Sequence, residues 1–70
     1  MKTYVTFGQS HLHSIDGVIF DKDCVAIVHG DRERVVELFG TKWCFEYPEE
    51  HWDESKMFYF PRGYIDVRVI

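Results

Sequence analysis

His11 and His13 are the residues whose type and spacing most clearly suggest chemistry. In an extended segment, residues two apart project to the same side, so both imidazoles could face one ligand. Two imidazoles can bind a phosphate when protonated, act as acid and base, or help to hold a metal. A metal would need further ligands, and no C-x-x-C or H-x-x-x-H spacing supplies them, so we expect no metal and no other cofactor. The alternative is that the two rings only form hydrogen bonds that fix a loop.

Arg62 follows Pro61 in a turn that is flanked by aromatic residues, among them Tyr64. A guanidinium on a rigid turn beside rings can recognise a phosphate or a nucleobase through paired hydrogen bonds and stacking. If the guanidinium and the two imidazoles converged, they would form a small pocket for an anion. The alternative is that Arg62 caps the turn and pairs with Glu49 or Glu50.

Trp52 stands in a polar segment that begins after Pro48. An indole without apolar neighbours in the chain either folds back as a lid over the sheet or is exposed as an anchor for a partner. Trp43, Phe45 and Tyr47 are different, because they alternate with other residues along one expected strand. We expect these three rings to form the underside of a sheet that packs on a helix.

The element order around residues 24–47 decides how these side chains are positioned. An apolar run at residues 24–29 predicts a buried strand. Asp31 is a suitable N-cap for a helix over residues 32–39, and Gly40 is a suitable residue to end it. Alternation over residues 42–47 predicts a second strand, so the succession is typical of a βαβ or split βαβ unit.

The remaining segments predict further strands around this unit. Strand-forming residues at 4–7 predict a strand beside the buried one. Asp16-Gly17 is a signal for a hairpin turn, although a long ordered loop is also compatible with the segment around it. Residues 57–60 could form a short strand, and alternation over residues 64–70 predicts a final strand.

The composition indicates one small acidic domain. Seventy residues leave room for a single α+β domain over residues 1–70, with a four- to five-stranded sheet and one helix packed on one face. A net charge of −4 argues against a protein that coats DNA. No apolar stretch has membrane length, so we expect no membrane partner, and we expect Cys24 and Cys44 to be reduced. An aromatic content of 17% suggests that some rings lie on a binding surface or a dimer interface.

Four segments of the chain resemble small proteins encoded by bacteriophages and prophages: YVTFGQSHLHSIDG, FDKDCVAIV, ELFGTKWCFEY and YFPRGY. They contain the motifs TFG-x-x-H-x-H, F-D-K-D-C-V-A, ELFG and Y-x-PRG in this order, over nearly the whole chain. The resemblance implies a phage origin and a site of action in the host cytoplasm. Small early phage proteins often bind and disable a host protein or sequester a defence signal.

We therefore predict a non-enzymatic binding protein that inhibits a host defence protein or sequesters a small anionic, nucleotide-like ligand. The candidate residues for binding the ligand or partner are His11, His13, Arg62, Tyr64 and Trp52. The alternative is a small hydrolase or nuclease in which His11 and His13 are acid and base and Arg62 holds the anion. A homodimer would add core and binding surface to so small a domain.

Overall fold

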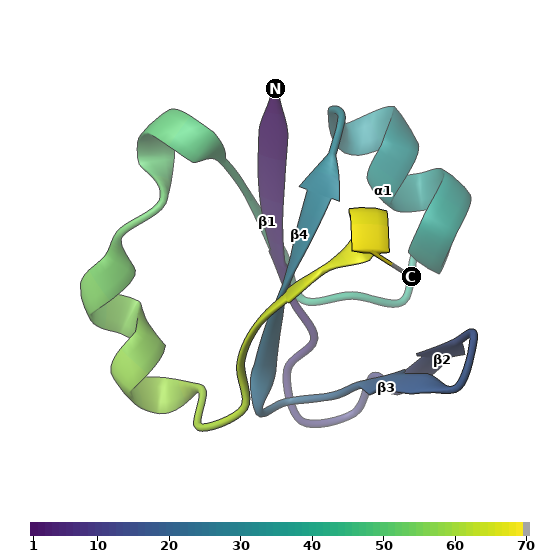
Figure 1. Ribbon diagram of the computed structural model, residues 1–70, viewed down its shortest axis with the longest axis horizontal. Helices are drawn as coiled ribbons and strands as arrows, with labels where there is room; N and C mark the ends of the chain where they lie inside the picture. The colour runs from purple at the N-terminus through teal and green to yellow at the C-terminus, as the bar shows by residue number, and fades with distance from the viewer. Residues whose placement is uncertain (70) are drawn as a thin grey trace.

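The centre of the fold is a four-stranded sheet with the strand order β5-β1-β4-β6. The computed structural model describes residues 1–69 of the chain (Figure 1). Strand β1 runs antiparallel to both β4 and β5, whereas β6 runs parallel to β4. The α+β class and the size of the predicted sheet are confirmed. The strands are β1 (Lys2–Thr6), β4 (Cys24–His29), β5 (Phe45–Pro48) and β6 (Gly63–Asp66).

Strands β4 and β5 and the helix α1 (Arg32–Phe39) form a split βαβ unit, with β1 inserted between the two strands. The carboxylate of Asp31 accepts a hydrogen bond from the Glu33 N–H at 3.0 Å and so caps the helix. Gly40, at φ 66°, donates its N–H to the Val36 carbonyl at 2.8 Å. The predicted bounds of the helix are confirmed, because each end has a local capping signal.

The two faces of the sheet are covered by different elements (Figure 1). One face packs on α1 and on the hairpin of β2 (His13–Ile15) and β3 (Val18–Phe20). The other face carries Tyr4 and Tyr47, which are register partners on β1 and β5. The buried core lies on the helix side and consists of Val5, Phe7, Phe20, Cys24, Ala26, Val28, Val35 and Phe39.

Of the two alternatives for the segment around Asp16 and Gly17, a hairpin or a long ordered loop, the structure has the hairpin. Both residues have positive φ, 50° and 82°, which is the conformation that a two-residue turn with the twist of the strands requires. The short strands place the ring of the buried Phe20 against two core rings. Its centroid lies 5.8 Å from that of Phe7 and 5.2 Å from that of Phe39. The hairpin therefore closes one end of the core.

The strand predicted over residues 42–47 begins later, at Phe45. Trp43 belongs to the loop after the helix, where its indole N–H donates to the Gly40 carbonyl at 2.9 Å. Its ring packs against the core, while Tyr47 lies on the opposite face of the sheet. The prediction that Trp43, Phe45 and Tyr47 share one face is therefore wrong for Trp43. The prediction that this face packs on the helix is wrong for Phe45 and Tyr47, which lie on the face away from α1.

The short strand suggested for residues 57–60 is wrong, and the final strand predicted over residues 64–70 is confirmed only as far as Asp66. Residues 57–60 contribute to the 3-10 helix η2 (Glu54–Tyr59) and the turn after it. Strand β6 ends at Asp66, and the chain continues as the 3-10 helix η3 (Val67–Val69) because the Asp66 carboxylate accepts the Arg68 N–H at 2.9 Å. The last residue of the predicted final strand, Ile70, lies outside the described residues.

Candidate functional site

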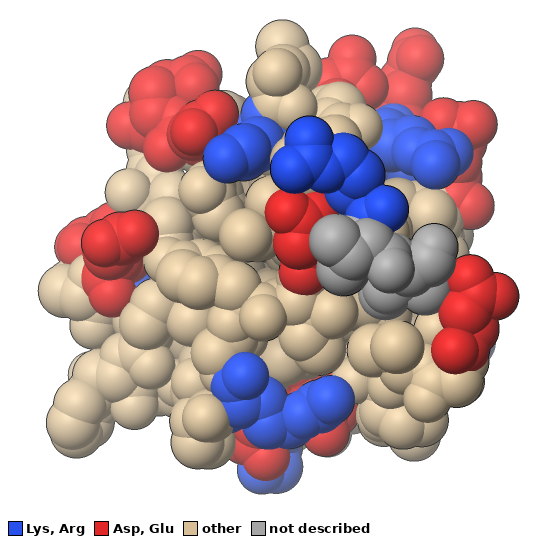
Figure 2. Space-filling model, in the orientation of Figure 1, with Lys and Arg blue, Asp and Glu red and all other residues tan. Residues whose placement is uncertain are grey.

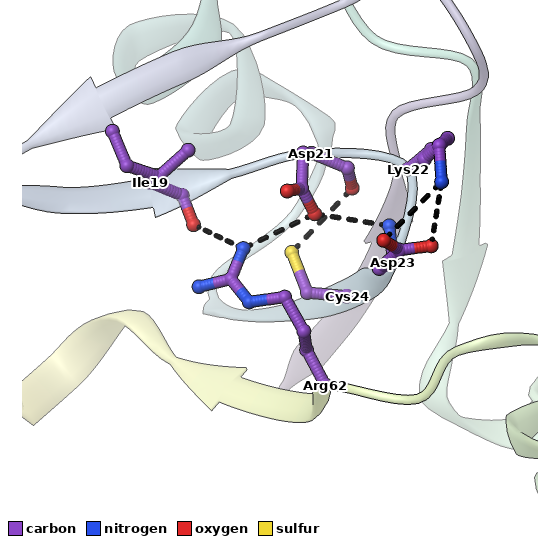
Figure 3. A network of polar contacts seen from close by, with 6 residues as sticks. All are labelled: Ile19, Asp21, Lys22, Asp23, Cys24 and Arg62. Carbon is purple, nitrogen blue, oxygen red and sulfur yellow. Dashed lines mark hydrogen bonds and ion pairs between the residues drawn. The ribbon is translucent and has the colours of Figure 1, made fainter.

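Arg62 connects the turn before β6 to the end of the β2–β3 hairpin (Figure 3). Its Nη1 donates to the Ile19 carbonyl at 2.8 Å and lies 3.1 Å from a carboxylate oxygen of Asp21. The guanidinium is therefore engaged within the molecule, and its acidic partner is Asp21 instead of the predicted Glu49 or Glu50. This contact ties the hairpin to the edge of the sheet.

The Asp21 carboxylate is the centre of this polar network (Figure 3). It also accepts the Asp23 N–H at 3.0 Å, and the backbone N–H of Arg62 donates to the Asp23 carbonyl at 2.9 Å. The hydrogen bond from Asp23 and the guanidinium of Arg62 lower the pKa of Asp21. The Cys24 thiol donates to the Asp21 carbonyl at 3.6 Å, and burial raises the pKa of Cys24. A buried neutral thiol is a poor nucleophile, so this network is suited to holding structure.

The two histidines have different surroundings. His13 lies on β2, and its Nε2 is within hydrogen-bonding distance of the Lys42 carbonyl. Its ring packs edge-on against Phe39 at 5.1 Å and lies 5.7 Å from Phe7. A carbonyl only accepts, so Nε2 must carry the proton in this contact. His11 is half-buried in the loop before β2.

The histidines and Arg62 do not combine into the pocket that would follow from their convergence. His13 contacts Lys42, whereas Arg62 contacts Ile19 and Asp21. No pocket opens among residues 1–69. Nor does that part of the chain contain a group of three or more His, Cys, Asp or Glu side chains placed to hold a metal ion.

Trp52 and Tyr64, two of the predicted binding residues, meet on the face of the sheet opposite α1. Trp52 stacks on Tyr4, with 5.2 Å between ring centroids, and meets Tyr47 edge-on at 5.3 Å. Its indole N–H donates to the Tyr64 hydroxyl at 2.8 Å. Trp52 therefore folds back over the sheet, and is not exposed as an anchor for a partner. We call Tyr4, Tyr47, Trp52 and Tyr64 the aromatic layer.

The aromatic layer fixes the segment Glu49–Tyr59, which runs along the side of the sheet away from α1 (Figure 1). The Lys56 ammonium lies 4.4 Å from the centroid of the Tyr47 ring and 3.4 Å from its hydroxyl. The Asp53 carboxylate accepts the Ser55 N–H at 3.0 Å and caps the start of η2. The segment is therefore anchored both to the sheet and by its own hydrogen bonds.

Phe58 and Tyr59 project from the end of η2 into solvent. Their exposed fractions are 87% and 73%, and their rings meet edge-on at 5.5 Å. The flanking Met57 and Phe60 are half-buried, so only the two middle residues of the apolar run at residues 57–60 are exposed. Surface this apolar is a common mark of an interaction site. We call Phe58 and Tyr59 the aromatic tip.

The aromatic tip was not among the residues predicted to bind. The sequence carried one signal for it, since an unbroken apolar run from Met57 to Phe60 in a polar segment must leave some rings in water. The general expectation that surplus rings lie at the surface is met by these two residues. What the sequence could not reveal was which residues of the run would face outward, because that depends on the 3-10 conformation of η2.

The segment that carries the aromatic tip is strongly acidic. Glu49, Glu50, Asp53 and Glu54 are all exposed, and the one Lys, Lys56, is half-buried. With His51 neutral, the segment has a formal net charge of −3 out of −4 for the whole chain. Figure 2 shows acidic side chains on this side of the molecule, at the left of the view, while Lys and Arg gather at the top and bottom.

Comparisons of the chain with protein-family models, with curated proteins and with solved structures found no match. Within residues 1–69, no helix combines the length and the apolar character that crossing a bilayer requires.

Proposed function

We propose that this chain is a non-enzymatic binding protein that engages a protein partner through its aromatic tip. The observation that carries the proposal is the exposure of two adjacent rings, Phe58 at 87% and Tyr59 at 73%, on a segment that is otherwise fixed to the sheet. The phage-like motifs support a host protein as the partner and the host cytoplasm as the place of action.

The anchoring of the tip supports binding for an energetic reason. Aromatic residues dominate the binding energy of many interfaces when they enter a pocket of the partner. Ordering a mobile segment on binding reduces affinity, and this cost is small when the segment is ordered beforehand. The stack of Trp52 on Tyr4 and the contact of Lys56 with the Tyr47 ring tie the backbone that carries Phe58 to the sheet.

The alternatives would need groups that are already engaged. A hydrolase or nuclease with His11 and His13 as acid and base could use only Nδ1 of His13, because Nε2 contacts the Lys42 carbonyl, and no pocket for a substrate opens among residues 1–69. A nucleotide-like ligand held by Arg62 would have to compete with Asp21 for the guanidinium. We therefore favour a protein partner over both.

The proposal is tested by quantitative capture from a bacterial extract with three immobilised proteins. These are the wild type, the double variant Phe58→Ser/Tyr59→Ser and the control Leu12→Ser, which changes an apolar residue that is 68% exposed near β2. We expect a protein that the wild type and the control retain equally and that the double variant retains about tenfold less.

The captured protein is then purified, and its affinity for the three forms is measured by calorimetry. Because all the substituted side chains are exposed, we expect the free energies of unfolding of the three proteins to differ by less than about 0.5 kcal/mol. If no protein distinguishes the double variant from the control, the aromatic tip is not a binding site.

A further inference from the structure

We infer that the partner presents a basic surface around an apolar pocket, so that the aromatic tip enters the pocket while the carboxylates of residues 49–54 face Lys and Arg. This inference rests on the proposed function and adds the chemistry of the partner. It follows from the charge of the segment, from the lack of ion pairs to Glu49, Glu50 and Glu54 within residues 1–69, and from the position of the tip.

The carboxylates around the tip outnumber the cations of their own segment. The segment Glu49–Tyr59 has four carboxylates and one ammonium, and that ammonium is held over the Tyr47 ring. In the part of the chain that the structure describes, no Lys or Arg forms an ion pair with Glu49, Glu50 or Glu54. Their charges therefore remain available to a partner.

The negative charge of the segment is fixed close to the tip. Asp53 caps η2, and hydrogen bonds from the side chain and backbone of Ser55 lower its pKa, so it is ionised at neutral pH. Glu54 begins the same helix that ends with the aromatic tip. Glu49 and Glu54 also contribute, after burial, to the raised pKa of Tyr4 on the neighbouring sheet. Their charges therefore act on Tyr4 of the aromatic layer.

The uncharged aromatic tip and the acidic segment around it together favour one class of partner. A field of this sign repels nucleic acids and acidic proteins and accelerates association with a basic surface. The charge can be compensated only at the edge of the contact, because the tip itself carries no charge. An apolar pocket with a basic rim is therefore the complementary surface.

The test uses a random peptide library displayed on yeast, with the purified chain as the bait. We expect the wild type to select peptides in which Lys and Arg flank apolar residues. We compare the variant Glu49→Gln/Glu54→Gln with the matched control Glu33→Gln/Glu37→Gln, which removes two exposed carboxylates from α1. Synthetic versions of the selected peptides are then measured at low and at high ionic strength.

The Glu49→Gln/Glu54→Gln variant should bind the selected peptides about fourfold more weakly at low ionic strength, with a smaller difference at high ionic strength. The Glu33→Gln/Glu37→Gln control should bind like the wild type. Peptides without enrichment of Lys and Arg, or equal losses in the two variants, would overturn the inference.

A third variant separates this inference from the proposed function. If Phe58→Ser/Tyr59→Ser abolishes peptide binding while the charge variants have no specific effect, the tip binds but the partner is not basic. If that double variant binds like the wild type, or no selected peptide depends on the tip, both proposals fail. Self-association of the wild type through the tip, measured by sedimentation, would make a second copy the occupant and would also overturn the inference.

Discussion

Replacing Trp52 by alanine tests whether the aromatic layer holds the acidic segment on the sheet. The substitution removes the stack on Tyr4, the edge contact with Tyr47 and the hydrogen bond to the Tyr64 hydroxyl. Truncation of a fully buried aromatic side chain costs about 3–5 kcal/mol, and we take about half of this for the half-buried Trp52. Since the hydrogen bond contributes about 1 kcal/mol, we expect a loss of about 3 kcal/mol in the free energy of unfolding.

The assay is urea unfolding followed by far-UV circular dichroism, with Phe58→Ala as the matched control. Phe58 lies in the same segment but is 87% exposed, so its truncation should cost less than about 0.5 kcal/mol. A loss of about 3 kcal/mol is large for a domain of this size, and the Trp52→Ala variant should unfold at a clearly lower urea concentration. Equal effects of the two substitutions would refute the anchoring role of Trp52.

Three further predictions concern the rest of the fold. Arg62→Gln should lower the free energy of unfolding by about 1 kcal/mol in urea unfolding at pH 7. Because the pKa of Asp21 is lowered below its ordinary value of 3.8, the stability from the ion pair is present above that pH and is lost as the pH falls through the folded pKa. The difference between the two proteins should therefore narrow in acid to what the hydrogen bond from Arg62 to the Ile19 carbonyl contributes. Asp31→Ala should cost about 1 kcal/mol in the same assay, because the helix loses its N-cap. Iodoacetamide should alkylate the exposed Cys44 rapidly and the buried Cys24 only on unfolding. Equal alkylation rates of the two thiols, measured by mass spectrometry, would contradict the burial of Cys24.

The sequence predicted the elements whose signals are local. The helix follows from Asp31, Gly40 and the spacing of the apolar residues between them, and each signal acts within a few residues. The hairpin follows from Asp16-Gly17 in the same way. Strand β4 was recognisable because an unbroken apolar run is typical of a strand buried on both faces.

The incorrect predictions depended on competition between local signals or on distant contacts. The run at residues 57–60 suggested a strand, but Asp53 starts a 3-10 helix by capping it with its carboxylate. The final strand ended early because the Asp66 carboxylate turns the backbone at Arg68. Periodicity alone does not weigh such hydrogen bonds against strand pairing.

The candidate site was only partly predictable for the same reason. No local pattern links Trp52 to Tyr64, and their contact depends on the pairing of β6 with β4, which brings distant segments together. Arg62 was recognised as an unusual residue, but its partner Asp21 lies far away in the chain. The exposure of Phe58 depends on how η2 sits on the sheet, which no local pattern encodes.

The most direct test of the binding proposal is the affinity of Phe58→Ser/Tyr59→Ser for the protein that the wild type captures. It is measured beside Leu12→Ser, with the free energy of unfolding determined for each form. We predict a loss of about tenfold or more for the double variant, near-wild-type affinity for the control and similar stability for all three. Wild-type affinity in the double variant would contradict the proposal that the aromatic tip is the binding site.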